Sequence, residues 1–109
     1  MIERPRVSER AAFVLDIRSD KIADYVEAHA EVWPEMLAAL KAAGIRNYSI
    51  FLEGTRAFGY FEADDLEEVS SSLAASESSA RWQRAMAEFL SEPLPPSGPQ
   101  TMREIFRLE

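Results

Sequence analysis

Three side chains with complementary chemistry recur at four-residue spacing: Tyr25, His29 and Trp33. Residues four apart on an α-helix lie nearly above one another, because the helix turns by about 100° per residue. A helix over residues 21–33 would therefore place a phenol, an imidazole and an indole in one stripe. An imidazole exchanges protons near neutral pH, and its two neighbours supply a hydrogen-bonding group and a flat apolar face. The spacing predicts a site that holds a small polar ring and moves protons on it.

The elements that must position this stripe follow from the hydrophobic pattern. Alternating apolar residues predict strands over residues 10–17, 46–52, 57–62 and 101–108. Apolar residues at helical spacing predict helices over residues 21–33, 34–43, 65–75 and 79–91. This order predicts an α+β fold, the ferredoxin-like split βαβ plan with an antiparallel sheet. The length predicts one domain, residues 10–109, after an irregular N-terminal arm at residues 1–9.

Particular residues predict where the helices begin and end. Ser19 or Asp20 is expected to cap the first helix. Pro34 is expected to break that helix at residues 31–34 and to begin the second one, because proline lacks an N–H but suits a first helical turn. Gly44 is expected to end the second helix. Asp64 or Asp65, and then Ser76 or Ser78, are expected to cap the last two.

The composition excludes several classes of function. The chain carries 19 acidic and 12 basic residues, a formal net charge of −7, which disfavours nucleic acid and anionic membrane surfaces as partners. It has no cysteine, so disulfides, thiolate catalysis and cysteine-based metal sites are absent. It has no apolar run long enough for a signal peptide or a membrane span. We therefore expect a cytoplasmic protein.

His29 is the single histidine and the candidate general acid or base. Its alternative interpretation is a structural histidine bonded to a neighbour on its helix. A metal site would need carboxylates beside it, and Glu31 and Glu35 do not lie one helical turn from His29. We therefore do not expect a metal at this histidine.

The other candidate side chains each have a structural alternative as well. Tyr25 and Tyr48 would be ordinary core residues unless their hydroxyl groups open into a shared pocket. Trp82 has polar neighbours, so its half-covered indole can form a platform for the C–H face of a sugar or pack a helix against the sheet. Trp33, before Pro34, is typical of a packing anchor.

The strands also predict assembly, because both of their faces carry apolar side chains. Within each strand, apolar residues lie on opposite faces: Phe13, Leu15 and Ile17 against Ala12 and Val14, Phe58 and Tyr60 against Phe61, and Ile105 against Phe106 and Leu108. The helices of this plan cover one face only, and an uncovered apolar face of this size would be an exposed patch. We therefore expect a homodimer that buries these sheet faces.

Taken together, these residues resemble the L-rhamnose mutarotases. The resemblance rests on Tyr25-x-x-x-His29-x-x-x-Trp33-Pro34-Glu35, then Gly44-x-x-Asn47-Tyr48-Ser49-Ile50, then Arg81-Trp82 and Glu104-x-Phe106. It extends from about residue 10 to residue 108 in order. It implies a dimeric α+β barrel of ferredoxin-like subunits, joined through their sheets, that interconverts the α and β anomers of L-rhamnose without cofactor or metal.

The resemblance also implies roles for single residues. His29 matches the proton donor of the family, and Tyr25 and Tyr48 match its sugar-binding tyrosines. Trp82 matches the first of two consecutive tryptophans that hold the sugar, and Gln83 stands where the family has the second. This departure bears on which sugar is bound, L-rhamnose or a closely related aldose.

Two alternatives of other classes stay open at this point. The same dimeric fold serves cofactor-free monooxygenases, which need a large apolar cavity for an aromatic substrate. A non-catalytic module would bind the monosaccharide without accelerating anomer exchange.

Overall fold

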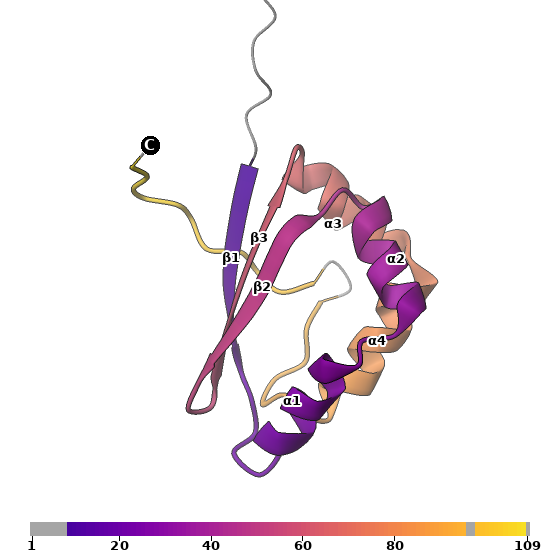
Figure 1. Cartoon of the computed structure of the whole chain (residues 1–109), viewed down its shortest axis with the longest axis vertical. Coiled ribbons are helices and arrows are strands. Elements are labelled where there is room, and N and C mark those ends of the chain that lie inside the picture. Colours follow the sequence, from indigo (N-terminus) through magenta and orange to yellow (C-terminus); the bar gives the residue numbers. More distant parts are fainter. Residues whose placement is uncertain (1–8, 96–97, 109) are drawn as a thin grey trace, which may run out of the picture.

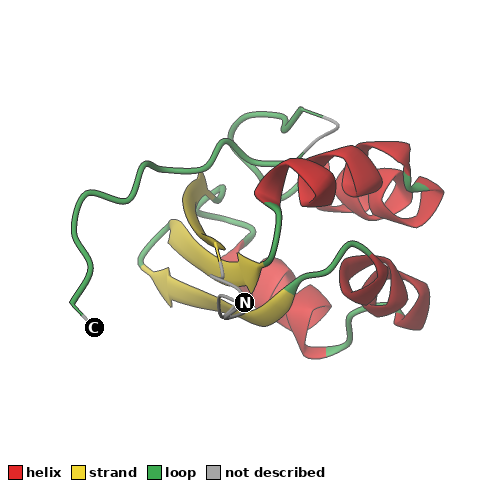
Figure 2. Ribbon diagram, turned by 90° about the horizontal axis from the view of Figure 1, so that it is seen from above, coloured by secondary structure: helices red, strands yellow, loops and turns green. Residues whose placement is uncertain are grey.

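A three-stranded antiparallel sheet covered on one side by four helices makes up the fold of this computed structural model, which describes residues 9–95 and 98–108 (Figure 1). In chain order the elements are β1 (Glu9–Asp16), α1 (Ile22–Ala30), α2 (Pro34–Ala42), β2 (Arg46–Glu53), β3 (Arg56–Ala63), α3 (Leu66–Ala75) and α4 (Glu77–Ala87). The strands lie in the order β1-β3-β2, and all helices lie on one side of the sheet (Figure 2). The predicted α+β class is confirmed.

The break between α1 and α2 falls where the proline predicts it. α1 ends at Ala30, Trp33 is extended (φ −56°, ψ 136°), and Pro34 is the first residue of α2. The proline ring keeps the preceding residue extended and is itself pre-set for a helical start. Gly44, with φ of +91°, follows the C-cap residue Ala43 and ends α2 as expected. The break therefore divides this part of the chain into two short helices.

Side-chain caps fix the starts of α3 and α4 but not that of α1. The side chains of Asp65 and Ser76 accept hydrogen bonds from the first backbone N–H groups of α3 and α4, as predicted. At α1 the prediction of a cap at Ser19 or Asp20 is wrong. Lys21 occupies the N-cap position there and makes no side-chain capping bond.

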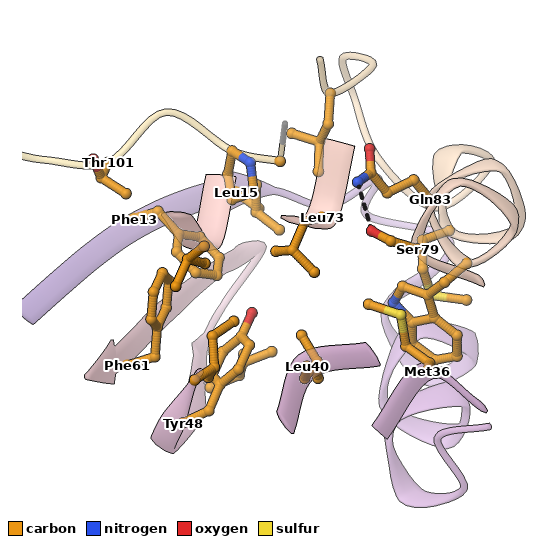
Figure 3. Close-up of a pocket in the computed structure, with 18 of the residues that line it drawn as sticks. Phe13, Leu15, Met36, Leu40, Tyr48, Phe61, Leu73, Ser79, Gln83 and Thr101 are labelled. Atoms are coloured by element: carbon orange, nitrogen blue, oxygen red, sulfur yellow. Dashed lines mark hydrogen bonds between the residues drawn. The ribbon is translucent and has the colours of Figure 1, made fainter. Parts of the chain in front are cut away.

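A bulge in β2 sets the direction of the strand's side chains. Arg46 and Ser49 pair with residues only two positions apart on β3, so β2 holds one extra residue between them. Asn47 has φ of 52°, a left-handed conformation that asparagine tolerates, and its amide donates a 2.9 Å hydrogen bond to Glu62. Tyr48 lies within this irregular stretch and on the helix-facing side of the sheet (Figure 3).

Gly59 leaves room in the core for the Phe13 ring, which contacts Tyr48. It pairs with Phe13 across β3 and β1, and the Phe13 ring occupies the space that a Cβ at position 59 would need. The buried Phe13 ring meets Tyr48 edge-on, with ring centroids 6.2 Å apart. The absence of a side chain at position 59 therefore helps to place a residue of the predicted site.

The segment after α4 is tied to the end of β1. Ile17 and Leu90 form an isolated antiparallel bridge, and the N–H groups of Arg18 and Ser91 donate to the carbonyl groups of Phe89 and Asp16. These bonds draw the end of α4 toward the sheet and direct the following segment over the space between the two layers (Figures 1 and 2).

The predicted fourth strand, residues 101–108, is wrong as a strand of this sheet. The N–H of Met102 donates to the carbonyl of Ala12 at 2.7 Å, and Arg10 pairs with Glu104 at 2.6 Å. Beyond these contacts the segment leaves the sheet on the side away from the helices (Figure 2), and Ile105 is 84 % exposed. Of the predicted arm at residues 1–9, only Glu9 lies within the described residues, as the first residue of β1. The domain boundary at residue 10 stays a prediction.

We predict that Gly59→Ala destabilises the fold by about 1–3 kcal/mol, because the added methyl group displaces the Phe13 ring from a packed core. Urea unfolding followed by far-UV circular dichroism measures the change. The matched control is the same substitution in a Phe13→Leu background, where the smaller side chain leaves room and the loss should shrink. Equal losses in both backgrounds would show that the overlap with Phe13 does not determine the cost.

Candidate functional site

A cavity of about 830 Å³ lies between the helix-facing side of the sheet and the helices (Figure 3). Phe13, Phe61 and Tyr48 reach it from the strands, and Ser79 and Gln83 reach it from α4. It is also lined by all five residues proposed from the sequence: Tyr25, His29, Tyr48, Trp82 and Gln83. The fold therefore brings together residues from α1, β2 and α4, the most distant of which are more than half of the chain apart in sequence.

His29 is held by the backbone of its own helix. Its Nδ1 lies 2.8 Å from the carbonyl oxygen of Tyr25. A carbonyl oxygen only accepts hydrogen bonds, so Nδ1 carries the hydrogen and donates it. In the neutral ring, Nε2 is then the basic nitrogen, and it becomes an acid once it is protonated. The helix thus fixes the orientation of the half-buried ring and leaves Nε2 to exchange protons.

Aromatic contacts surround that imidazole. The Tyr25 ring lies against it with centroids 4.3 Å apart and planes inclined by 34°, and the Trp82 ring meets it edge-on at 5.5 Å. Trp82 in turn meets Trp33 at 5.1 Å and 90°. The predicted stripe is therefore correct for Tyr25 and His29 but wrong for Trp33, which lies beyond the end of α1 and packs against Trp82 instead.

Tyr48 approaches the cavity from the sheet. Its hydroxyl group points into the cavity, while its ring packs against Phe13 and against Phe61, whose centroid lies 5.4 Å away (Figure 3). Although 36 % of Tyr48 is accessible, that surface faces a cavity with mostly apolar walls. Phe13 and Phe61 thus hold the Tyr48 ring, and the hydroxyl group can form a hydrogen bond with a ligand in the cavity.

Burial raises the pKa of both phenols. It raises the pKa of Tyr25 to about 12. It raises the pKa of Tyr48 further, and the nearby Tyr25 phenol adds a smaller electrostatic contribution in the same direction. Both phenols are therefore neutral near pH 7. In that state they can donate hydrogen bonds to a ligand, but they are poor bases.

Gln83 is oriented by a buried serine that sequence reasoning missed. Ser79 is only 1 % exposed, and its Oγ accepts a 3.2 Å hydrogen bond from Nε2 of Gln83, one helical turn later (Figure 3). The four-residue spacing on one helix is the signal that would have found the pair. The bond anchors the amide in the wall of the cavity, next to Trp82.

The described residues that line the cavity include no Asp, Glu, Lys or Arg. Across the described part of the chain, no three His, Cys, Asp or Glu side chains gather where they could hold a metal ion. Within the same residues, no helix has the length and apolar character needed to cross a membrane. A cavity with neutral polar groups and one imidazole suits an uncharged polar ligand.

Comparison with known sequences gives a consistent result. Residues 10–108 match the family model described as L-rhamnose mutarotase. The L-rhamnose mutarotases of Yersinia pestis (strain Pestoides F) and Yersinia pseudotuberculosis serotype O:1b are each 39 % identical over 103 residues, which cover 92 % of this chain and 98 % of each relative.

Comparison with solved structures also finds an L-rhamnose mutarotase. The crystal structure of an L-rhamnose mutarotase from Formosa agariphila superposes with a TM-score of 0.73 and 28 % identity, covering 93 % of this chain and 99 % of that one. A conserved protein from Methanosarcina mazei Go1 superposes with a TM-score of 0.62 over 95 % of both chains. At 14 % identity, that likeness concerns the fold alone.

We predict that the tyrosines resist alkaline ionisation. The chain has three, and the third, Tyr60, also has a raised pKa because its hydroxyl donates to Glu62. Tyrosines of an unfolded chain ionise near pH 10, so the folded state binds these protons more tightly. Stability is then fully present below about pH 10 and is lost as the pH rises toward 12.

Ultraviolet absorbance of tyrosinate, followed together with far-UV circular dichroism, measures this. We expect little ionisation at pH 10 and a joint loss of structure and of phenol protons at higher pH. Three phenols that titrate near pH 10 in a fully folded protein would contradict the burial argument.

Proposed function

The chain belongs to the L-rhamnose mutarotase family, and we propose that it interconverts the α and β anomers of L-rhamnose by general acid/base opening and closing of the sugar ring. The observation that carries the assignment of the site is the imidazole of His29, held with Nε2 available beside two neutral phenols in one cavity. Ring opening needs a proton at the ring oxygen and the loss of one from the anomeric hydroxyl. Positioned acid/base catalysis supplies roughly 10²–10⁴-fold, which suits a reaction that already proceeds slowly in water.

Each of the remaining residues has a role in this proposal. His29 delivers the proton to the ring oxygen. Tyr25 and Tyr48 donate hydrogen bonds to ring or hydroxyl oxygens, which the raised pKa values of these phenols favour. Trp82 offers its indole to the C–H face of the sugar, and Gln83 contacts a hydroxyl group through its anchored amide.

The choice of sugar depends on Gln83. The resemblance places a second tryptophan at this position in other members, whereas this chain offers an amide held by Ser79. The substrate class is therefore L-rhamnose or a closely related aldose. Saturation-transfer NMR of anomeric protons with L-rhamnose, L-fucose and D-mannose ranks the candidates directly.

The alternatives from the sequence are not favoured by the family assignment. A cofactor-free monooxygenase would consume oxygen with quinols, and a binding module would leave the rate of anomer exchange unchanged. A cytoplasmic location stays a prediction from composition.

We also propose that two copies of the chain assemble through their sheets. On the face away from the helices, Phe51 is 67 % exposed and Phe58 is 43 % exposed. The same chain provides an extended segment whose apolar residues Ile105, Phe106 and Leu108 are exposed. A second copy supplies complementary apolar surface for both features, which makes it the occupant best suited to this face.

We predict that His29→Ala slows L-rhamnose anomer exchange at least tenfold while leaving the fold intact, because the proton carrier is removed and only a half-buried side chain is truncated. Saturation-transfer NMR measures the exchange, and circular dichroism checks the fold. Glu27→Gln, an exposed change on the same helix, is the matched control and should keep the wild-type rate. Equal rates in the His29→Ala variant and the wild type would remove His29 from the mechanism.

We predict a dimeric mass in solution at micromolar concentration, against 12.3 kDa for one chain. Light scattering coupled to size exclusion measures it. Phe51→Ser combined with Phe58→Ser should shift the equilibrium toward monomers, because both changes remove apolar area from the proposed interface. Val26→Ser removes a similarly exposed apolar residue from α1 and serves as the control. A monomeric wild type would contradict the proposed assembly.

A further inference from the structure

Mutarotation requires two proton transfers, but the described residues that line the cavity supply one imidazole. The anomeric hydroxyl must lose a proton and the ring oxygen must gain one. Among the described residues that line the cavity, the side chains with an ionisable proton are Tyr25, His29 and Tyr48, and no carboxylate is present. The proposed function names His29 as the acid and leaves the base unassigned.

We propose that His29 performs both transfers through the same atom, Nε2, as a proton relay between the anomeric oxygen and the ring oxygen. Two features of the geometry support this. Nδ1 is committed to the carbonyl of Tyr25 at 2.8 Å, so the ring presents one nitrogen for exchange. The two sugar oxygens are bonded to the same carbon, so a single nitrogen beside that carbon can reach both. This inference rests on the proposed function.

The relay balances without any further reactant. Neutral Nε2 takes the proton from the anomeric hydroxyl, and the electron pair of that O–H bond forms the carbonyl double bond at C1. The bond from C1 to the ring oxygen breaks, and its electron pair goes to the ring oxygen. The imidazolium then returns the proton from Nε2 to the ring oxygen. Rotation about the C1–C2 bond and the reverse sequence on the other face of the carbonyl give the second anomer, and His29 ends neutral as it began.

The phenols do not supply the missing base in this scheme. A phenol is protonated near pH 7 even at its ordinary pKa, and burial raises the pKa of both further, which makes them still less able to lose a proton. They act as hydrogen-bond donors, which stabilise negative charge on an oxygen without taking its proton. Tyr25 lies against one face of the imidazole, and Tyr48 faces the cavity from the sheet.

Charged groups on the elements around His29 lie outside this cavity. Asp24 and Glu27 of α1, and the C-cap residues Glu31 of α1 and Glu88 of α4, line a second hollow of about 460 Å³. This hollow shares Trp82 and Met86 with the first. Arg81 and Arg84 of α4 are exposed. Among the residues that the structure describes, the titratable groups that line the cavity together with His29 are therefore Tyr25 and Tyr48.

The test is the pH dependence of kcat for L-rhamnose anomer exchange in the full chain, with the enzyme-free rate subtracted at each pH. A relay that starts from neutral imidazole predicts one inflection on the acid side, with unit slope, and a plateau up to about pH 10, where buried tyrosines still hold their protons. A second inflection on the alkaline side below that pH would mean a separate acid and would overturn the relay.

Tyr25→Phe and Tyr48→Phe test whether a phenol is the second proton carrier. If each phenol only donates a hydrogen bond, its removal raises KM by roughly 5- to 30-fold and keeps the single-inflection profile of kcat. A loss of about 10²-fold or more in kcat for either variant would assign the acid role to that tyrosine and overturn the relay. Circular dichroism confirms that both variants fold.

Mixtures of H₂O and D₂O test whether a water molecule carries the second proton. One nitrogen that moves one proton at a time predicts a linear dependence of kcat on the deuterium fraction. A curved dependence would mean that a second proton moves together with the first and would overturn the relay. A wild-type protein that fails to accelerate anomer exchange refutes the proposed function itself, whereas acceleration with any of the contrary results above refutes the relay alone.

Discussion

The hydrogen bond from Nδ1 of His29 to the carbonyl of Tyr25 is the constraint around which the site is arranged. It joins two residues of one turn of α1, so it needs no partner from another element. It fixes the tautomer and the direction of the ring at once. The Tyr25 ring is packed against the same imidazole, so one turn of helix supplies the proton carrier, its orientation and a hydrogen-bond donor. The sheet and α4 then need only to bring Tyr48 and Trp82 to a ring that is already placed.

The electrostatic character of the cavity follows from what lines it. A monosaccharide is uncharged, so a site of hydroxyl, amide and indole groups can bind it without burying an ion. Apolar walls raise the pKa values of Tyr25 and Tyr48 and keep both phenols neutral. The same low polarity strengthens the hydrogen bonds that these phenols donate to oxygens as charge develops on them. A carboxylate in this cavity would carry a desolvation penalty that this arrangement avoids.

Most helix boundaries could be predicted from residues close to them in sequence. The pairing of strands with distant parts of the chain could not be predicted in the same way. Pro34 and the caps Asp65 and Ser76 act within a few residues of themselves, and the structure places the helix boundaries there. The alternation over residues 101–108 indicates a strand-forming segment but says nothing about the partner it pairs with, and in this chain it leaves the sheet. The bulge at Asn47 was also invisible, because the pattern does not reveal which residue is unpaired. The candidate site residues were predicted from side-chain chemistry and family resemblance, whereas neither signal singled out Ser79, which lines the cavity and holds Gln83.

The pleat of the sheet separates the cavity face, which carries the candidate site, from the outer face, which carries the proposed dimer interface. Along β3, Phe58 faces away from the helices while Gly59, its neighbour, lies beneath Phe13 on the cavity side. Successive side chains of a strand point to opposite faces, so an apolar residue can serve assembly without entering the cavity. At the next position, Gly59 has no side chain and so leaves room for the Phe13 ring, which contacts Tyr48. In the proposed dimer, the outer faces of the sheets are buried and the proton relay remains within one chain, because the groups that it needs all lie on the inner face and on the helices that cover it.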